Sequence, residues 1–242
     1  MTSLLATFKD STALITGASS GIGQGYAKHF ASLGINLILT ARTEQKLIIL
    51  ADELTQKYNV NITVISLDLS KTHAAQTLFE EIQNRNLSVN ILINNAGSLV
   101  NKPFLETTAA DLAEMLESNV MSHFKMIKAC VPIMQSGSHI VNVGSMGGFQ
   151  GSVKFPGLSA YSASKAALHT LSECLAFELA DKGIKVNCLA LGSAQTEMLE
   201  AAFPGYESPV MAFEMGKYIA DFAKTGHKFF NGKILPVAVT TP

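Results

Sequence analysis

Eight residues near the start of the chain read Thr16-Gly17-Ala18-Ser19-Ser20-Gly21-Ile22-Gly23. The β-prone run 12–15 precedes them, and residues 22–33 follow with apolar side chains at helical spacing. This pattern predicts a glycine-rich turn between a buried strand and the N-terminus of a helix. Such a turn points backbone N–H groups and the positive end of a helix at one place, which suits a phosphate.

The glycines of this turn are expected to have separate tasks. Gly17 lets the chain turn tightly, and Gly21 and Gly23 let the backbone approach a pyrophosphate. Gly25 would let the helix pack closely on the strand. A glycine-rich turn alone is a weak signal, but its place between a strand and a helix favours a dinucleotide-binding motif.

Strand-like and helix-like segments alternate along the chain. The predicted strands are 12–16, 35–40, 61–66, 89–93, 139–143, 184–190 and 233–238. The predicted helices are 22–33, 43–57, 71–83, 107–134, 159–181 and 211–224. Several strands are continuous apolar runs, as expected when both faces of a sheet are covered. The alternation predicts an α/β fold of Rossmann type, a doubly wound parallel sheet of about seven strands with helices on both faces.

The composition is that of one soluble domain. The chain has 242 residues, 48% of them hydrophobic, which predicts a single domain over residues 1–242. A net charge of −1 with scattered Lys and Arg leaves no electrostatic footprint for nucleic acid. The apolar runs fall short of the ~18 residues of a membrane span, and residues 1–10 lack a secretion signal. A cytoplasmic location without membrane attachment is therefore expected.

Cysteine and histidine give no metal motif. Cys130, Cys174 and Cys188 are isolated and are expected to be free, buried thiols in a reducing compartment. The histidines are dispersed, so no metal ligand set is expected. His139 precedes the fifth strand and is expected at the surface.

The residues that follow the second strand bear on cofactor choice. A site selective for NAD commonly offers an acidic residue about twenty positions past the glycines, where this chain has Thr40-Ala41-Arg42. Arg42 can instead pair with a 2′-phosphate, which favours NADP(H) over NAD(H). The alternative is that Arg42 is a solvated surface residue.

Two further strand ends carry polar or small residues. Asp68, followed by Leu69, could meet an adenine amino group or merely cap the helix that begins near Lys71. The fourth strand ends in Asn94-Asn95-Ala96-Gly97, whose small residues let the chain pass close to a ribose. A plain turn is the alternative for the second segment.

A candidate proton-transfer group follows the fifth strand. Tyr161 and Lys165 are four residues apart and therefore share one face of the predicted helix. A nearby ammonium, together with an oxidised nicotinamide, would lower the pKa of the phenol. Such a tyrosine can exchange a proton with a carbonyl or alcohol oxygen. Ser145, at the strand end, can hydrogen-bond the same oxygen.

Taken together, these motifs resemble the compact, single-domain branch of the short-chain dehydrogenase/reductase family, over residues 8 to 224. The resemblance implies that Tyr161 is the general acid/base and that Ser145 orients the substrate carbonyl. It implies that Lys165 binds the nicotinamide ribose and lowers the pKa of the tyrosine. Asn119 matches an asparagine that holds a water in a proton relay to Lys165. Family members usually form dimers or tetramers through two long helices, here 107–134 and 159–181.

The resemblance also implies the residues that hold the nucleotide. Gly192, Ala194 and Thr196 match the segment beside the nicotinamide carboxamide. The full expected cofactor set is Gly17, Ala18, Ser19, Ser20, Gly21, Ile22, Gly23, Arg42, Asp68, Leu69, Asn95, Ala96, Gly97, Tyr161, Lys165, Gly192, Ala194 and Thr196.

Three segments depart from the family pattern. Leu191-Gly192 stands where Pro-Gly is usual, so this backbone is expected to be less rigid. The interval from Ser145 to Tyr161 is three residues longer than usual, which would place Phe149 and Phe155 beside the substrate. Residues 230–236 replace the usual ending, so the usual C-terminal contacts are not expected.

Four other residues allow two interpretations. Met198, Met211 and Met215 could line a pliable substrate lid or be ordinary amphipathic packing. His169, one turn beyond Lys165, could join a proton relay, although a place in the core or at an oligomer interface is favoured.

The expected function is an NADP(H)-dependent oxidoreductase that interconverts a ketone or aldehyde and an alcohol, with a small-molecule substrate and a homodimeric or homotetrameric assembly. One alternative is a nucleotide-binding regulator of the same fold with little or no turnover. Another is an extended-branch epimerase or dehydratase, but only about fifty residues follow the sixth strand, too few for a substrate domain.

Overall fold

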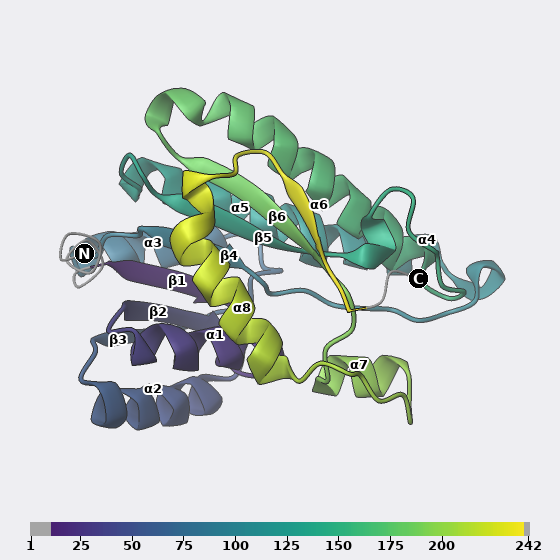
Figure 1. Ribbon diagram of the computed structural model, residues 1–242, viewed down its shortest axis with the longest axis horizontal. Helices are drawn as coiled ribbons and strands as arrows, with labels where there is room; N and C mark the ends of the chain where they lie inside the picture. The colour runs from purple at the N-terminus through teal and green to yellow at the C-terminus, as the bar shows by residue number, and fades with distance from the viewer. Residues whose placement is uncertain (1–10, 240–242) are drawn as a thin grey trace.

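The computed structural model describes residues 11–239, which contain a single parallel sheet of seven strands (Figure 1). The strand order is β3-β2-β1-β4-β5-β6-β7. The strands are β1 (Thr12–Thr16), β2 (Asn36–Ala41), β3 (Ile62–Ser66), β4 (Ile91–Asn94), β5 (His139–Ser145), β6 (Lys185–Leu191) and β7 (Ile234–Val237). The prediction of a doubly wound parallel sheet is confirmed, and each predicted strand lies within two residues of an observed one.

Helices cover both faces of this sheet (Figure 1). The α-helices are α1 (Gly21–Ser32), α2 (Glu44–Tyr58), α3 (Ala74–Asn84), α4 (Ala109–Leu116), α5 (Ser122–Cys130), α6 (Ser159–Glu178), α7 (Glu197–Ala202) and α8 (Ala212–Thr225). Short turns of other helix types are η1 (Phe104–Glu106), η2 (Glu117–Met121), η3 (Val131–Ile133), η4 (Met146–Gly148), η5 (Ala180–Lys182) and η6 (Gly226–Lys228).

Two hydrophobic cores form because successive strand residues point to opposite faces. On one face Ile15 packs with α1, α2 and α8, where Phe30 is fully buried. On the other face Leu14 packs with α3, α5 and α6, where Leu78 is 1% exposed. Each such buried side chain stabilises the fold by about 2 kcal/mol. The continuous apolar strands of the sequence are therefore explained by a core on each side.

The strand order fixes where a ligand can bind. The chain runs outward from β1 through β2 to β3, and then returns to place β4 on the other side of β1. The two connections leave β1 and β4 in opposite directions, which opens a crevice beyond their carboxyl ends. The loops after β1, β4, β5 and β6 meet at this edge.

The long helix predicted over 107–134 is interrupted. α4 leads into the π-helical turn η2, then α5 follows, and η3 begins where Pro132 ends the α-helical hydrogen bonding. The predicted helix 71–83 begins later, at Ala74. α7 was not predicted, because six residues are too few to show a helical period.

Three expectations about burial and packing are wrong. His139 is 1% exposed, since its Nδ1 donates to the carbonyl of Ala223 at 2.8 Å from the α8 side of the sheet. Cys174 is exposed, whereas Cys130 and Cys188 are buried free thiols as expected. Gly25 faces α8 rather than the strand, because a Cβ there would lie 3.0 Å from the carbonyl oxygen of Ala212.

No helix among residues 11–239 is long and apolar enough to cross a membrane. Within the same range, no three His, Cys, Asp or Glu side chains gather as a metal site would require.

Candidate active site

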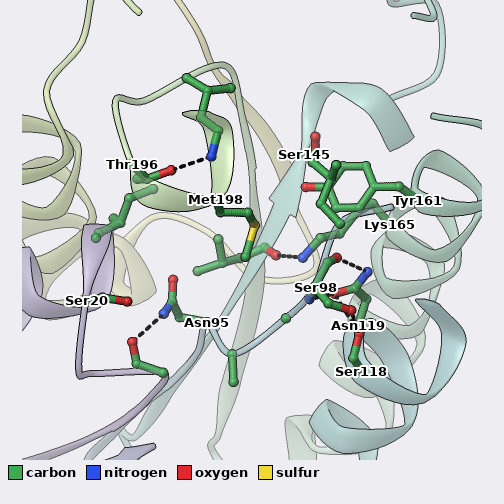
Figure 2. Close-up of a pocket in the computed structure, with 18 of the residues that line it drawn as sticks. Ser20, Asn95, Ser98, Ser118, Asn119, Ser145, Tyr161, Lys165, Thr196 and Met198 are labelled. Atoms are coloured by element: carbon green, nitrogen blue, oxygen red, sulfur yellow. Dashed lines mark hydrogen bonds between the residues drawn. The ribbon is translucent and has the colours of Figure 1, made fainter. Parts of the chain in front are cut away.

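A cavity of about 1300 Å³ lies at the carboxyl edge of the sheet. Its walls come from the turn after β1, the loops after β2 to β6, and α7. Figure 2 shows Ser145, Tyr161 and Lys165 on one side of it, with Ser20 and Asn95 on the other. The residues that the sequence assigned separately to a nucleotide and to proton transfer therefore share one cavity.

The glycine-rich turn is built by close backbone contacts. Gly17 and Gly21 have φ of 67° and 54°, in the left-handed region that favours glycine. A Cβ on Gly23 would lie 2.0 Å from the carbonyl oxygen of Gly17. Gly23 is therefore required for the turn to close on itself. It was expected to approach the pyrophosphate, but it does not line the cavity.

The N-terminus of α1 opens into the cavity. Ser19, Ser20, Gly21 and Ile22 line the wall there. The N-cap residue Ser20 makes no side-chain capping bond, and the first turn holds no acidic residue. The backbone N–H groups in the first turn of α1 are thus left to bind an anion. Ala18 was also expected to contact the nucleotide, but it is buried behind the turn, where its N–H donates to Thr40.

Asn95 ties the end of β4 to this turn. Its Nδ2 donates to the carbonyls of Thr16 at 3.0 Å and Gly17 at 3.2 Å, and its Oδ1 accepts from the Tyr26 hydroxyl. The Thr16 hydroxyl in turn accepts from the N–H groups of Asn95 and Ala96. Asn95, Ala96 and Gly97 all line the cavity. The amide thus locks two of the walls together.

Two cations lie at the far end of the cavity. Arg42 and Lys46 both line it and both are exposed. Sequence reasoning missed Lys46, although its spacing of four from Arg42 was a usable signal. Asp68 and Leu69 line the same end. Asp68 accepts from the N–H and hydroxyl of Ser70, which hold its pKa below the usual value, and it does not cap α3.

Ser145 and Tyr161 lie next to each other on the same side of the cavity (Figure 2). The Ser145 hydroxyl accepts from the N–H of Gly147 at 3.1 Å, which leaves its own proton free to be donated. Burial raises the pKa of Tyr161 above its ordinary value, and a hydrogen bond with Ser145 opposes that rise. The lowered pKa that we expect requires an oxidised nicotinamide as well as Lys165, so it stays a prediction for the protein with its cofactor bound.

Lys165 is 4% exposed and lies beneath the tyrosine. Its Nζ donates to the carbonyl of Val143 at 2.8 Å and lies 5.8 Å from the centroid of the Tyr161 ring. Burial lowers the pKa of Lys165 to about 8. One of its three N–H donors is thus used on the protein, and the group is still mainly an ammonium at pH 7.

Asn119 is fully buried at the π-helical turn. Its Oδ1 accepts from the N–H of Ser98, while its Nδ2 donates to the carbonyl of Ser98 and to the Ser164 hydroxyl, each at 3.0 Å. The side chain therefore pins the loop after β4 to α6. It makes no hydrogen bond to Lys165, and the relay through a water stays a prediction.

The loop after β6 closes the cavity against the glycine turn. Gly192, Ala194 and Thr196 all line it, and their contact with the nicotinamide carboxamide stays a prediction. The Thr196 methyl lies 3.2 Å from where a Cβ of Gly21 would be, so the two loops touch. Gly192, which lacks the usual preceding proline, donates its N–H to Val237 of β7 at 2.9 Å. This hydrogen bond to β7 restrains the backbone at Gly192, where the missing proline had led us to expect less rigidity.

The remaining candidates divide between the cavity and the core. Met198 and Phe155 line the cavity. Met215 is a core residue at 4% exposure, and Met211 is exposed elsewhere. Phe149 packs edge-on against His169 instead, with ring centroids 6.5 Å apart.

His169 lies in the core, as favoured. It is 6% exposed, and burial lowers its pKa to about 4.

Residues 11–207 match the model of the short chain dehydrogenase family. This match spans more than three quarters of the chain. The chain belongs to the short-chain dehydrogenase family. It is an oxidoreductase of that family, and the family resemblance read from the sequence is confirmed.

Individual family members are similar over most of the chain. Sulfoacetaldehyde reductase 2 of Chromohalobacter salexigens is 36% identical over 188 residues, 76% of this chain and 73% of the relative. A dehydrogenase/reductase of Sinorhizobium meliloti has a TM-score of 0.87 at 29% identity, covering 97% and 96% of the two chains. The RhlG/NADP active-site complex of Pseudomonas aeruginosa has a TM-score of 0.84 at 26% identity, covering 96% and 97%.

Proposed function

We propose that this protein interconverts a ketone or aldehyde and the corresponding alcohol, with NADP(H) as cofactor and Tyr161 as general acid/base. The observation that carries the proposal is the placement of Ser145, Tyr161 and Lys165 in the same cavity as the open N-terminus of α1. The reductase activity named for the Chromohalobacter relative supports the reaction class.

The cavity fits a nicotinamide dinucleotide. Gly17 and Gly21 have no side chains, so the backbone can approach a pyrophosphate there. The first turn of α1 has no side-chain cap and supplies N–H donors. Asp68 and Leu69 would flank the adenine, and Thr196 with Gly192 would flank the nicotinamide. Lys165 would hold the nicotinamide ribose with the N–H donors that Val143 leaves free.

Arg42 and Lys46 support the preference for the phosphorylated cofactor. Two cations four residues apart can both approach a 2′-phosphate, and the end of β2 carries no carboxylate that would repel it. The NADP complex of the Pseudomonas relative supports the same choice.

When bound, the nicotinamide supplies the hydride that is added to the carbonyl carbon. Ser145 donates a hydrogen bond to the carbonyl oxygen and holds it beside Tyr161. Tyr161 gives its phenolic proton to that oxygen as negative charge develops there. The raised pKa of Tyr161 keeps this proton in place at neutral pH. The Lys165 ammonium then stabilises the phenolate that remains.

The test is NADPH oxidation by the purified protein with a panel of ketones and aldehydes. The proposal predicts turnover with at least one neutral carbonyl compound and a slower reaction with NADH. Tight NADPH binding without oxidation across the panel would contradict it and favour the regulatory alternative.

We also propose that the protein forms a homodimer or homotetramer. Apolar side chains stand exposed along α4 to α5, where Leu112, Leu116 and Phe124 are 37–40% exposed. Several large apolar side chains exposed on neighbouring helical segments favour an interface. Sedimentation at micromolar concentration should give a mass of two or four chains, and a monomer would contradict the proposal.

A further inference from the structure

One end of the cavity has walls of a different chemistry from the nucleotide end. Its described side chains are mainly apolar, namely Phe155, Leu158, Met198, Leu199, Phe203 and Tyr206. They come from the long loop between Ser145 and Tyr161 and from α7 with the residues after it.

Asn101 holds these two segments together. Its Nδ2 donates to the carbonyl of Ala202, at the end of α7, at 2.8 Å. Its Oδ1 lies 2.0 Å from where a Cβ of Gly157 would be, and the neighbouring Lys102 N–H donates to the carbonyl of Gly157 at 2.9 Å. The loop and α7 are therefore held together at this end of the cavity, which Tyr161 also lines.

The charges of the cavity are distributed unevenly. Arg42 and Lys46 stand at the nucleotide end, and Lys165 is committed beneath Tyr161. Glu197, directly before Met198, lines the cavity and makes no ion pair within residues 11–239. At the apolar end, the described lining therefore offers no cation to an anionic substrate.

Besides the Glu197 carboxylate, this compartment offers hydroxyl groups. Ser193 and Tyr206 lie within hydrogen-bond distance at 3.3 Å, and Ser208 donates to Ser193 at 3.1 Å. Hydroxyls can hydrogen-bond a neutral ester, ether or alcohol, but they do not replace the hydration of a full charge.

We infer that the substrate is an uncharged carbonyl compound with an apolar body, and that the compartment discriminates against carbonyl compounds bearing a carboxylate or sulfonate. The inference rests on the proposed function. An anion placed there loses hydration without gaining a cationic partner, and Glu197 adds repulsion. In this respect we expect the chain to differ from the relative named for sulfoacetaldehyde, whose aldehyde carries a sulfonate.

A pair of ketones of equal size compares an apolar end with an anionic one. The compounds 6-methylheptan-2-one and 5-oxohexanoate differ only in that an isopropyl end replaces a carboxylate. Each is compared by kcat/KM with NADPH, and by calorimetric binding to the protein saturated with NADP⁺, where no reduction can occur. We expect the neutral ketone to be favoured at least about tenfold in both measurements. Equal or better performance of the carboxylate would overturn the inference.

A variant tests whether the wall formed by α7 causes the discrimination against carboxylates. Met198→Arg places a cation in the compartment. It should reduce the preference for the neutral ketone at least about fivefold, because the cation improves the binding and turnover of 5-oxohexanoate. Met211→Arg is the matched control, because Met211 is 56% exposed and lies outside the cavity. A Met198→Arg variant that keeps the wild-type preference would overturn the assignment.

The two measurements separate this inference from the proposed function. Selective binding of the neutral ketone without NADPH oxidation would support the inference and contradict the proposed reaction. Failure of both ketones to bind would overturn the inference.

Discussion

At the scale of single residues, a few charged side chains decide what the cavity can bind. Arg42 is the residue that we propose decides cofactor choice, and Lys46 lines the same end of the cavity. Both are exposed, so each contributes through a charge-assisted contact rather than through packing.

Arg42→Ala should weaken NADPH binding by about 10- to 100-fold and leave NADH binding nearly unchanged, because only NADPH carries the 2′-phosphate. Lys46→Ala should have a smaller effect with the same selectivity. Dissociation constants from NAD(P)H fluorescence test this, with Arg85→Ala as control, since Arg85 pairs with Glu81 on α3. Equal losses for the two nucleotides would undo the cofactor assignment.

The spacing of residues along the chain predicted which side chains lie together, but it did not predict how their surroundings change their properties. Tyr161 and Lys165 could be paired because a separation of four is visible in the chain, and Ser145 because it ends a predicted strand. The raised pKa of Tyr161 in the protein without its cofactor could not be predicted, because it comes from burial, which only the completed fold sets. Lys46 was missed because an exposed lysine in a helix is usually a solvated one.

At the scale of elements, η2 shows how a helix is adapted to hold a loop. The π-helical turn carries Asn119, whose amide satisfies both backbone groups of Ser98. Helical periodicity predicted one continuous helix there, since a single-turn π segment leaves the apolar spacing nearly intact. The family resemblance therefore identified Asn119, but the sequence did not predict the π-helical turn that positions it.

Asn119→Ala should lower the free energy of unfolding by about 1–3 kcal/mol, because it removes a fully buried amide that bonds both backbone groups of Ser98 and donates to the Ser164 hydroxyl. Urea titration of the variant measures this. Asn84→Ala is the control, since Asn84 is exposed at the end of α3, and its effect should stay within about 0.5 kcal/mol. An unchanged midpoint for Asn119→Ala would contradict the role assigned to its amide.

At the scale of the whole molecule, the sheet buries histidines that must stay neutral. Burial lowers the pKa of His123 to about 3 and that of His139 to about 4. The folded state therefore binds fewer protons than the unfolded state below about pH 6.5. Stability is at its full value above that pH and is lost as the pH falls toward 4.

For His139 the loss amounts to about 3 kcal/mol by pH 4, because burial lowers its pKa from the ordinary 6.5 to about 4. Urea titrations between pH 7 and pH 4.5 should show the decline. His139→Gln should make it shallower, whereas His73→Gln, at an exposed position, should not. An identical pH dependence in wild type and His139→Gln would contradict this explanation.

The global architecture was the most predictable feature, and the placement of His139 shows what was not. Alternating periods and apolar strands specify a doubly wound sheet, because both faces of such a sheet need cover. His139 stands alone in a strand pattern and gives no sign that α8 supplies its acceptor. Contacts between elements far apart in sequence are set by the completed fold and leave no local signal.

The central claim is that Tyr161 supplies the proton while other groups hold the nucleotide. Its most direct test is Tyr161→Phe, measured for both NADPH binding and ketone reduction, with Tyr218→Phe as an exposed control. The account predicts a kcat lower by about 100- to 10,000-fold and a NADPH dissociation constant within about twofold of wild type. Turnover close to that of wild type would contradict it.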